Sequence, residues 1–448
     1  MHTLKLTIAV LGLSAMVLLN ACKKGDMPHI DPHGFQDNEA VLYWNEKTSI
    51  VLTAPFTPPA QCRYFAMVQI AVHDALNSIK PKYECFALLQ TKDPLAASGA
   101  AVAAATHHII VNKLQIQGTH PMNEWYQDWL SKIPDGDSKQ RGIALGVAAA
   151  EAIFAKRSTD NFETANFQGP GPDGVAPGEY RSTLPFSLPV FPAKPKPLAK
   201  WSTLTPFVIE SSTQFRVEPP YPVTSSEYTA DYNEVKAKGG RAVHTRTEEE
   251  DQIGRFWVER SSIGWNRLAR TLIQTKKIDA WKTARLLALL HTAMTDGTIT
   301  NFESKYHYFY WRPETAIRLG NDDGNSATTG DPSWLPSYTE SPNPANEAMN
   351  VNTPPIPDYP SAHANFGAAA GEVLRLFFGT DKIAVDLTSP TAPGIKRRYT
   401  TLSSAIRDNS LSRIYVGYHF RKAVLAGEEQ GIKVGNYVFN HAFRENQD

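Results

Sequence analysis

Three short stretches of the 448-residue chain carry residues whose types and spacing could bind and act on a small anion. The middle stretch, residues 359–364, reads Tyr-Pro-Ser-Ala-His-Ala and separates a proline-rich loop from a run of small residues that predicts a helix. We therefore expect Ser361 at the N-cap of that helix, where free backbone N–H groups and the helix dipole attract anions. His363 adds a group that can transfer a proton.

The first stretch, residues 305–313, places two cations on either side of an almost unbroken aromatic run. Lys305 and Arg312 are seven residues apart, so a helix would present both side chains on one face. Pro313 disfavours helical geometry in the residue before it, which predicts that Arg312 lies where the helix ends. Taken alone, a buried aromatic helix between two surface cations is the simpler interpretation.

The third stretch, residues 412–420, contains Arg413 and, six positions later, His419. A continuous helix would turn these two side chains to different faces. They can reach one centre only near a helix end or where the helix is distorted, and Gly417 lies between them. Taken alone, an amphipathic helix with incidental charges explains this stretch, and a structural role explains His363.

Together, the three stretches supply the groups that a tetrahedral oxyanion requires. Arginine guanidinium groups bind oxyanions through paired, charge-assisted hydrogen bonds, and a lysine adds a point charge. A serine hydroxyl and the N–H groups of a helix end can bind the remaining oxygens. Of the two histidines, one can supply a ligand nitrogen and the other a proton.

This ordered set resembles the signature of the superfamily that joins vanadium-dependent haloperoxidases with type-2 phosphatidic acid phosphatases. The superfamily pattern is Lys-x6-Arg-Pro, then Pro-Ser-Gly-His, then Ser-Arg-x3-Gly-x-His, and the chain has all three with Ala362 in place of the glycine. The neighbouring sequence is similar to the soluble bacterial haloperoxidase branch. The resemblance runs weakly from about Glu39 to Phe443 and is specific only from Asp296 onward.

The resemblance implies an all-α fold of two packed helical bundles with long Pro/Gly-rich loops and vanadate near its centre, without haem or nucleotide. It implies that vanadium acts as a Lewis acid toward hydrogen peroxide, without changing redox state, and that halide is oxidised to hypohalous acid. By motif, His419 would ligate the metal and His363 would be the acid–base residue. The vanadate oxygens would be held by Lys305, Arg312, Ser361, the Ala362 amide and Arg413.

Two other functions stay open. An acid phosphatase on the same frame would bind a phosphate ester, with His419 as nucleophile and His363 as the acid for the leaving alcohol. A non-catalytic surface lipoprotein that binds a ligand would not need its polar side chains to meet. If the six motif side chains lay more than roughly 10 Å from a common point, no single anion could touch them all.

Four positions depart from the superfamily pattern. The Ala362 methyl enters the anion cradle, and Ala423 stands where an aspartate usually orients the second histidine. We expect Glu259 or Glu428 as the substitute carboxylate. Near the halide site, Phe302 replaces tryptophan or arginine and Ile356 replaces phenylalanine or histidine, so a more apolar halide pocket is predicted.

The N-terminus has the pattern of a bacterial lipoprotein. Residues 1–21 form a short basic and then apolar signal peptide, and Cys22 would become the lipidated first residue, followed by a polar tether to residue 38. An ordinary secretory signal is the alternative. We expect an exported protein that is anchored to a membrane by lipid alone. A single domain would occupy residues 39–448, with the specific motifs in residues 296–443.

The composition fits this interpretation. Lys and Arg total 45, as do Asp and Glu, so the chain lacks the basic excess of a nucleic-acid-binding protein. Helical spacing dominates and alternating β-type runs are nearly absent, whereas residues 168–197 and 321–359 are irregular and rich in proline. Cys62 and Cys85 are either a disulfide in an exported protein or two free thiols.

Overall fold

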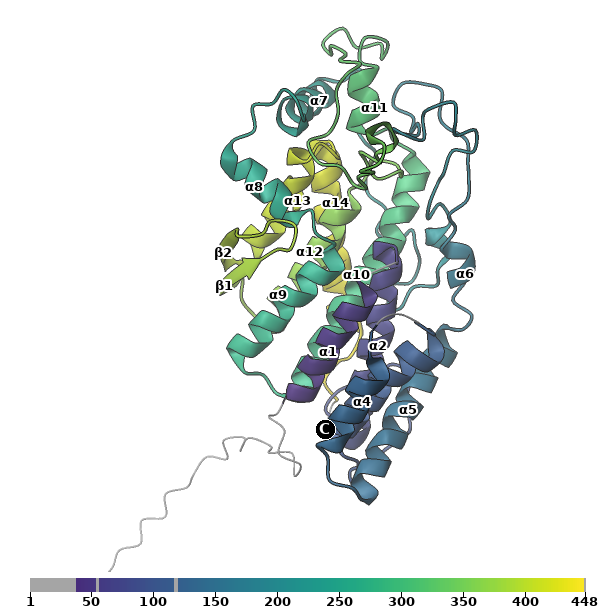
Figure 1. Cartoon of the computed structure of the whole chain (residues 1–448), viewed down its shortest axis with the longest axis vertical. Helices are drawn as coiled ribbons and strands as arrows, with labels where there is room; N and C mark the ends of the chain where they lie inside the picture. Colours follow the sequence, from purple (N-terminus) through teal and green to yellow (C-terminus); the bar gives the residue numbers. More distant parts are fainter. Residues whose placement is uncertain (1–37, 54–55, 117–119, 447–448) are drawn as a thin grey trace, which may run out of the picture.

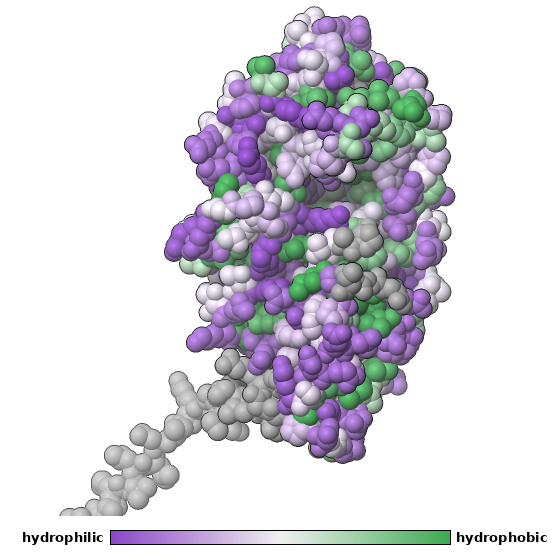
Figure 2. All heavy atoms as spheres, in the orientation of Figure 1, coloured by the Kyte–Doolittle hydropathy of each residue, from purple (hydrophilic) through white to green (hydrophobic). Residues whose placement is uncertain are grey.

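The computed structural model describes residues 38–53, 56–116 and 120–446. The predicted signal peptide, Cys22 and the tether up to residue 37 lie outside the described residues and stay predictions. None of the helices in the described ranges is long and apolar enough to cross a membrane. On the face drawn in Figure 2, hydrophilic side chains surround scattered hydrophobic ones, and the surface is hollowed near its centre.

The N-terminal third folds into one helical bundle, at the lower end of Figure 1. Its core helices approach closely because the facing residues are small: a Cβ added at Gly146 would lie 2.3 Å from the carbonyl oxygen of Ala101. Its elements are α1 (Glu39–Leu52), α2 (Pro58–Ile79), α3 (Ser98–His107), the π-helical η1 (His108–Lys113), α4 (Met122–Ser131) and α5 (Asp137–Arg157).

The C-terminal half forms the second bundle, and α10 packs against α2 to join the two. The all-α fold of two packed bundles is therefore confirmed. The helices of this half are α7 (Ser226–Gly239), α8 (Glu248–Trp257), α9 (Ser261–Lys276), α10 (Ala280–Tyr308), α11 (Pro313–Arg318), α12 (Ala362–Phe378), α13 (Leu402–Tyr415) and α14 (Arg421–His441). Short α6 (Phe162–Ala165), η2 (Trp201–Thr203) and η3 (Glu347–Met349) lie in the connecting loops.

Helix α12 lies at the centre of this bundle and packs against α10, α13 and α14. Three glycines, four residues apart on α14, face it, and a Cβ on Gly431 would lie 2.3 Å from the carbonyl oxygen of Asn365. Gly427 packs equally closely on the backbone of Ser361. The backbone N–H of Ser361 donates to the carbonyl of Ala423 over 2.8 Å. The glycines therefore set the position of the turn that begins α12.

Two features were not predicted. Helix α7 occupies residues that carry no strong apolar periodicity. Strands β1 (Lys382–Thr388) and β2 (Lys396–Thr401) form an antiparallel hairpin, with Val385 opposite Tyr399. In β1 the residues alternate between exposed and buried, so its apolar side chains pack on the bundle. The hairpin is a small addition that leaves the helical class unchanged.

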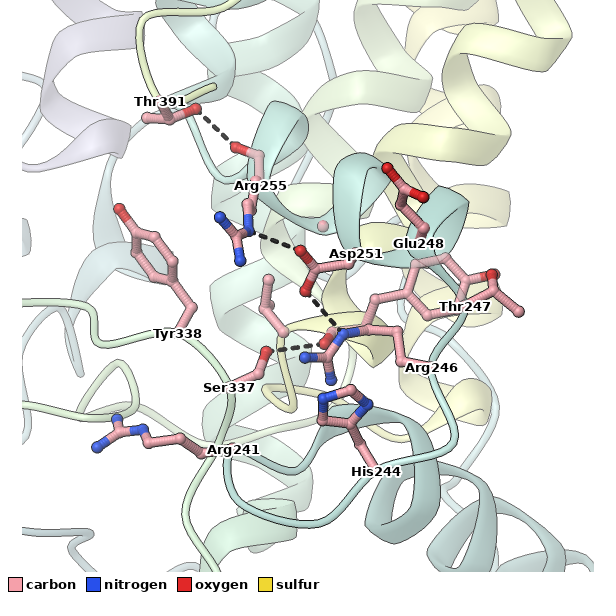
Figure 3. Close-up of a pocket in the computed structure, with 13 residues that line it drawn as sticks. Arg241, His244, Arg246, Thr247, Glu248, Asp251, Arg255, Ser337, Tyr338 and Thr391 are labelled. Atoms are coloured by element: carbon pink, nitrogen blue, oxygen red, sulfur yellow. Dashed lines mark hydrogen bonds and ion pairs between the residues drawn. The ribbon is translucent and has the colours of Figure 1, made fainter. Parts of the chain in front are cut away.

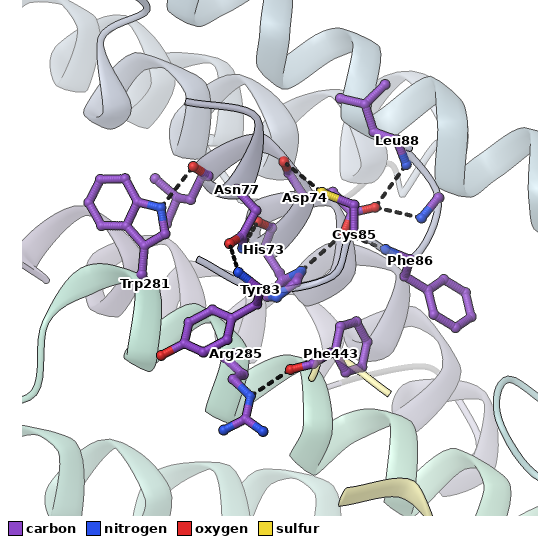
Figure 4. A network of polar contacts seen from close by, with 12 residues as sticks. His73, Asp74, Asn77, Tyr83, Cys85, Phe86, Leu88, Trp281, Arg285 and Phe443 are labelled. Atoms are coloured by element: carbon purple, nitrogen blue, oxygen red, sulfur yellow. Dashed lines mark hydrogen bonds and ion pairs between the residues drawn. The ribbon is translucent and has the colours of Figure 1, made fainter. Parts of the chain in front are cut away.

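Buried carboxylates hold the long loops to the bundles. Asp296 of α10 accepts the backbone N–H groups of residues 207–209 over 2.7 to 3.0 Å. Asp74 of α2 accepts those of residues 86–88, beside His73 and Cys85 (Figure 4). Cys62 and Cys85, the two cysteines among the described residues, are free thiols, which settles the predicted alternatives against a disulfide. Satisfied loop N–H groups allow these irregular segments to cover the helices.

The close contact of α12 with α14 predicts that Gly431→Ala destabilises the fold. Alanine favours helix over glycine by about 1 kcal/mol. A methyl group 2.3 Å from the Asn365 carbonyl cannot be accommodated unless a backbone moves, which costs about 1–3 kcal/mol and occasionally more. We expect a net loss in the free energy of unfolding, measured by urea denaturation. The control Lys433→Ala, on the exposed side of α14, should change it by less than about 0.5 kcal/mol; equal stability of all three proteins would contradict the packing argument.

Candidate active site

Lys305 lies in the last turn of α10 with no exposed surface. Its Nζ donates to the backbone carbonyls of Pro357 and Asp358, each over 2.9 Å. Burial lowers the pKa of Lys305 well below its usual value, and the neighbouring Arg312 lowers it further. The lysine thus ties the end of α10 to the loop that leads into α12.

Arg312 follows an abrupt end of α10. Phe309 takes a left-handed conformation with φ of 47°, so the helix stops at Tyr308, and Arg312 is an extended residue that begins α11. The prediction that one helix presents Lys305 and Arg312 on a common face was therefore wrong, although the non-helical backbone before Pro313 was predicted. The Arg312 guanidinium donates to the carbonyls of Ile356 (2.7 Å) and Tyr418 (2.9 Å).

Ser361 is the N-cap of α12, as predicted, and its hydroxyl accepts the N–H of Ala364 over 3.4 Å. Ala362 is in the first helical turn with negative φ, so the substitution for glycine imposes no left-handed strain. The Nδ1 atom of His363 lies 3.0 Å from the Ser261 hydroxyl. No described residue is a hydrogen-bond partner of His363 Nε2, which is buried.

The last motif is distorted where the sequence predicted it. Helix α13 ends at Tyr415, and Gly417 has φ of 83°, a conformation that favours glycine. The backbone N–H groups of Tyr418 and His419 both turn back to the carbonyl of Arg413, over 2.9 and 3.3 Å. A Cβ on Gly417 would lie 2.5 Å from the carbonyl oxygen of Gly239. Reversal at this glycine brings His419 to the same centre as Arg413.

The first and the last motif are in contact at His419. Its Nε2 atom lies 3.0 Å from Nη1 of Arg312, and the residue is 4% exposed. Arg413 faces the ring of Tyr418 at 5.3 Å. Lys305, Arg312, His363 and Arg413 are all close enough to His419 to lower its pKa, so these five predicted residues lie around one centre. Ser361 and Ala362 directly precede His363 at the start of α12. Their individual roles stay predictions.

Positive charge is in excess at this centre. Lys305, Arg312 and Arg413 are buried, each at most 5% exposed. Burial lowers the pKa of Arg413 to about 10, and no described residue pairs with its Nε and Nη2 atoms. Buried cations and unpaired donors are costly unless an anion compensates them. The donor set therefore fits a small oxyanion such as vanadate or phosphate.

The carboxylate beside His419 was missed. Asp358 Oδ1 lies 2.8 Å from His419 Nδ1, so neither Glu259 nor Glu428 is the substitute that we expected. Glu259 instead pairs with Arg267, over 2.8 Å. The Asp358 side chain has no exposed surface, and burial raises its pKa to about 7 against the opposing effects of the nearby cations. An acidic residue three positions before Ser361 was the available signal.

The two residues predicted for the halide pocket lie in one apolar cluster. Phe302 is 2% exposed, and Ile356 and Ala362 are partly buried against the same cluster. Its other buried members include Trp201 and Leu198, which come from the proline-rich loops. Apolar side chains at both positions are therefore packed beside the start of α12, and their role in a halide pocket stays a prediction.

A second, open pocket of about 680 Å³ lies on the outer side of the last motif, next to Tyr415 (Figure 3). It also contains arginines, but these are paired. Arg246 and Arg255 both contact Asp251, over 3.0 and 2.7 Å. Arg241 donates to the carbonyl of Pro336 over 3.2 Å. The inner cluster with its unpaired guanidinium is therefore the better anion site.

Comparison with known proteins agrees with this assignment. Residues 285–448 match the model of the VCPO second helical-bundle domain. The vanadium chloroperoxidase of Curvularia inaequalis is 26% identical over 503 residues, covering 88% of this chain and 80% of that protein. These findings confirm the resemblance to vanadium-dependent haloperoxidases that the three motifs indicated.

Solved structures show the same fold. The first bacterial vanadium-dependent iodoperoxidase matches with a TM-score of 0.72 and 22% identity, over 92% of this chain and 98% of that one. The holo form of a bacterial vanadium-dependent chloroperoxidase matches with a TM-score of 0.66 and 15% identity, over 90% and 97% of the two chains. Both have the two-bundle architecture described above.

The buried cations predict that an oxyanion stabilises the protein. Orthovanadate or inorganic phosphate at 100 times its dissociation constant should add about 2.7 kcal/mol to the free energy of unfolding. The midpoint of thermal unfolding, measured by calorimetry, should rise accordingly. Arg413→Met should abolish most of the rise without destabilising the protein alone, since a buried cation is removed.

Arg398→Met is the matched control for this test. Arg398 carries the same charge but is 68% exposed on β2. The control should retain the full anion-dependent rise at equal ionic strength. If it lost the rise as well, or if Arg413→Met kept it, general screening of charge rather than a defined site would explain the effect.

Proposed function

We propose that this protein is a vanadate-dependent haloperoxidase that oxidises a halide with hydrogen peroxide to hypohalous acid. The observation that carries the proposal is the buried cation cluster, with three cations to one carboxylate and unpaired donors on Arg413, beside Nε2 of His419. The matched relatives are named vanadium chloroperoxidase and vanadium-dependent iodoperoxidase, which supports this chemistry.

The chain's residues divide into oxygen donors and one metal ligand. Arg312, Arg413 and Lys305 would neutralise vanadate oxygens, together with the Ser361 hydroxyl and the Ala362 N–H at the start of α12. His419 would ligate vanadium through Nε2. Bound vanadate supplies Lewis acidity that activates hydrogen peroxide without a change in redox state.

His363 is suited to move a proton at the edge of the cluster. Burial lowers its pKa well below the usual value, and Arg413 lowers it further, so the imidazole is neutral. Ser261 contacts Nδ1, which leaves the buried Nε2 free to accept a proton from hydrogen peroxide and return it to a product.

The apolar cluster of Phe302 and Ile356 would make the halide pocket apolar. Without hydrogen-bond donors from these side chains, a halide entering the pocket loses hydration that they do not replace. Iodide is the largest halide and the least costly to dehydrate, because the cost of transferring an ion falls with its radius. We therefore expect iodide to be oxidised faster than bromide, and bromide faster than chloride.

Acid phosphatase activity is the second candidate. The same cradle fits a phosphate ester, and the contact of Asp358 with His419 supplies the orienting carboxylate that a nucleophilic histidine needs. A non-catalytic lipoprotein is less well supported, because that function does not explain why six polar side chains meet. The similarity to haloperoxidases over most of the chain favours the first proposal.

Reconstitution tests the proposed activity. Purified protein loaded with orthovanadate should oxidise iodide and bromide in the presence of hydrogen peroxide. The oxidation is measured through the halogenation of a phenolic indicator. Phosphate-ester hydrolysis without vanadate should be slow by comparison. Hydrolysis in the absence of any halide oxidation would reject the haloperoxidase and favour the phosphatase.

Substitution of the two histidines tests the division of roles. His419→Ala removes the proposed metal ligand, so vanadate affinity measured by calorimetry should fall by at least about 10-fold and halide oxidation should be lost. His363→Ala should leave that affinity nearly unchanged and slow turnover by about 100-fold or more, because only a proton-transfer group is removed. Equal losses of affinity in both variants would contradict this division.

A further inference from the structure

The two ring nitrogens of His419 meet partners of opposite character. Nε2 lies 3.0 Å from a guanidinium nitrogen of Arg312, which can only donate. Nδ1 lies 2.8 Å from Oδ1 of Asp358, which can only accept when the carboxyl is ionised. Nδ1 and Oδ1 are within hydrogen-bonding distance but are not aligned as a hydrogen bond, and neither has another hydrogen-bond partner among the described residues. The tautomer with hydrogen on Nδ1 and a lone pair on Nε2 suits both distances. This is the tautomer that a metal-ligating Nε2 requires.

Helix α14 has no carboxylate at the position where the superfamily pattern places one. The residue four positions after His419 is Ala423, which is 1% exposed and ends in a methyl group. Its backbone carbonyl accepts the N–H of Ser361 over 2.8 Å. The position that holds an aspartate in the superfamily pattern thus contributes here only a backbone contact to the anion cradle.

The backbone of Asp358 is held on both sides. Its N–H donates to the carbonyl of Tyr310 over 2.8 Å, and its carbonyl accepts Nζ of Lys305 over 2.9 Å. Two residues earlier, the carbonyl of Ile356 accepts Nε of Arg312 over 2.7 Å. The two cations of the first motif therefore position the segment that carries the carboxylate. The loop does not have to move for the Asp358 side chain to reach His419.

We propose that Asp358 is the positioning residue for His419 and replaces, from the loop before α12, the carboxylate that the superfamily pattern places on the last helix. It fixes the ring orientation and keeps hydrogen on Nδ1, so that the Nε2 lone pair can ligate the vanadium atom of a vanadate held by the cation cluster. Such outer contacts raise the basicity of a ligating histidine. This inference rests on the proposed function, in which His419 is a ligand.

Relocation of the carboxylate tests the proposal. Asp358→Asn presents an amide N–H that favours the wrong tautomer, as an asparagine does beside a catalytic histidine. In protein without vanadate, ¹⁵N NMR of labelled histidine should show that His419 loses the tautomer with hydrogen on Nδ1. Calorimetry should show orthovanadate affinity reduced by about 10- to 100-fold. In the double variant Asp358→Asn with Ala423→Asp, both properties should recover at least in part.

Asp231→Asn is the matched control. Asp231 is another buried carboxylate near Asp358, but it accepts the N–H of Lys422 over 2.7 Å at the start of α14, a capping role that asparagine can also fill. The control should keep the His419 tautomer and the vanadate affinity of the unaltered protein. A merely structural role of Asp358 would lower stability without a change of tautomer.

The outcomes separate the two proposals. If Asp358→Asn leaves the tautomer and the affinity unchanged, or if the control changes them equally, Asp358 is not the positioning residue. If the unaltered protein fails to bind orthovanadate, the proposed function fails. The NMR measurement on protein without vanadate still decides the role of Asp358 in that case, because it requires no bound anion.

Discussion

The burial of three cations around one carboxylate is the constraint on which the rest of this structure depends. Lys305, Arg312 and Arg413 are removed from water, and Asp358 is the fully buried carboxylate among them. Backbone carbonyls of residues 356–358 and 418 accept hydrogen bonds from two of the cations and thereby offset part of the desolvation cost. The remaining charge is an unfavourable feature that folding tolerates and that an anion relieves. Stability and anion binding are therefore linked.

The helices serve mainly to bring three non-helical points together. Arg312 is extended between α10 and α11, Ser361 caps α12, and His419 follows the reversal at Gly417. Each functional residue thus lies at a helix end, where side chains and free N–H groups can point at a common centre. The glycines of α14 are essential to this arrangement, because they allow the Ser361 turn to rest directly on that helix.

The sequence predicted what depends on local chemistry and missed what depends on tertiary contact. The cap at Ser361 follows from its position between a proline-rich loop and a helix, and the distortion at Gly417 follows from the spacing of Arg413 and His419. The prediction that Lys305 and Arg312 share one helix face was wrong, because no local rule requires Phe309 to take a left-handed conformation. The role of Asp358 was missed, because its partner His419 is 61 residues away and the superfamily pattern directed attention to position 423.

The contact between Arg312 and His419 explains how this charged centre stays ordered. The guanidinium donates toward the nitrogen that we propose as the metal ligand, so a bound oxyanion has to replace that contact with its own oxygens. The exchange reduces the net gain from binding, since one charge-assisted hydrogen bond is given up. It also means that Asp358, His419 and Arg312 are in contact before an anion arrives, and that only the contact between Arg312 and His419 has to be exchanged on binding. Preorganised donors of this kind need little rearrangement at the moment of reaction, which is the condition under which buried electrostatic groups assist catalysis most.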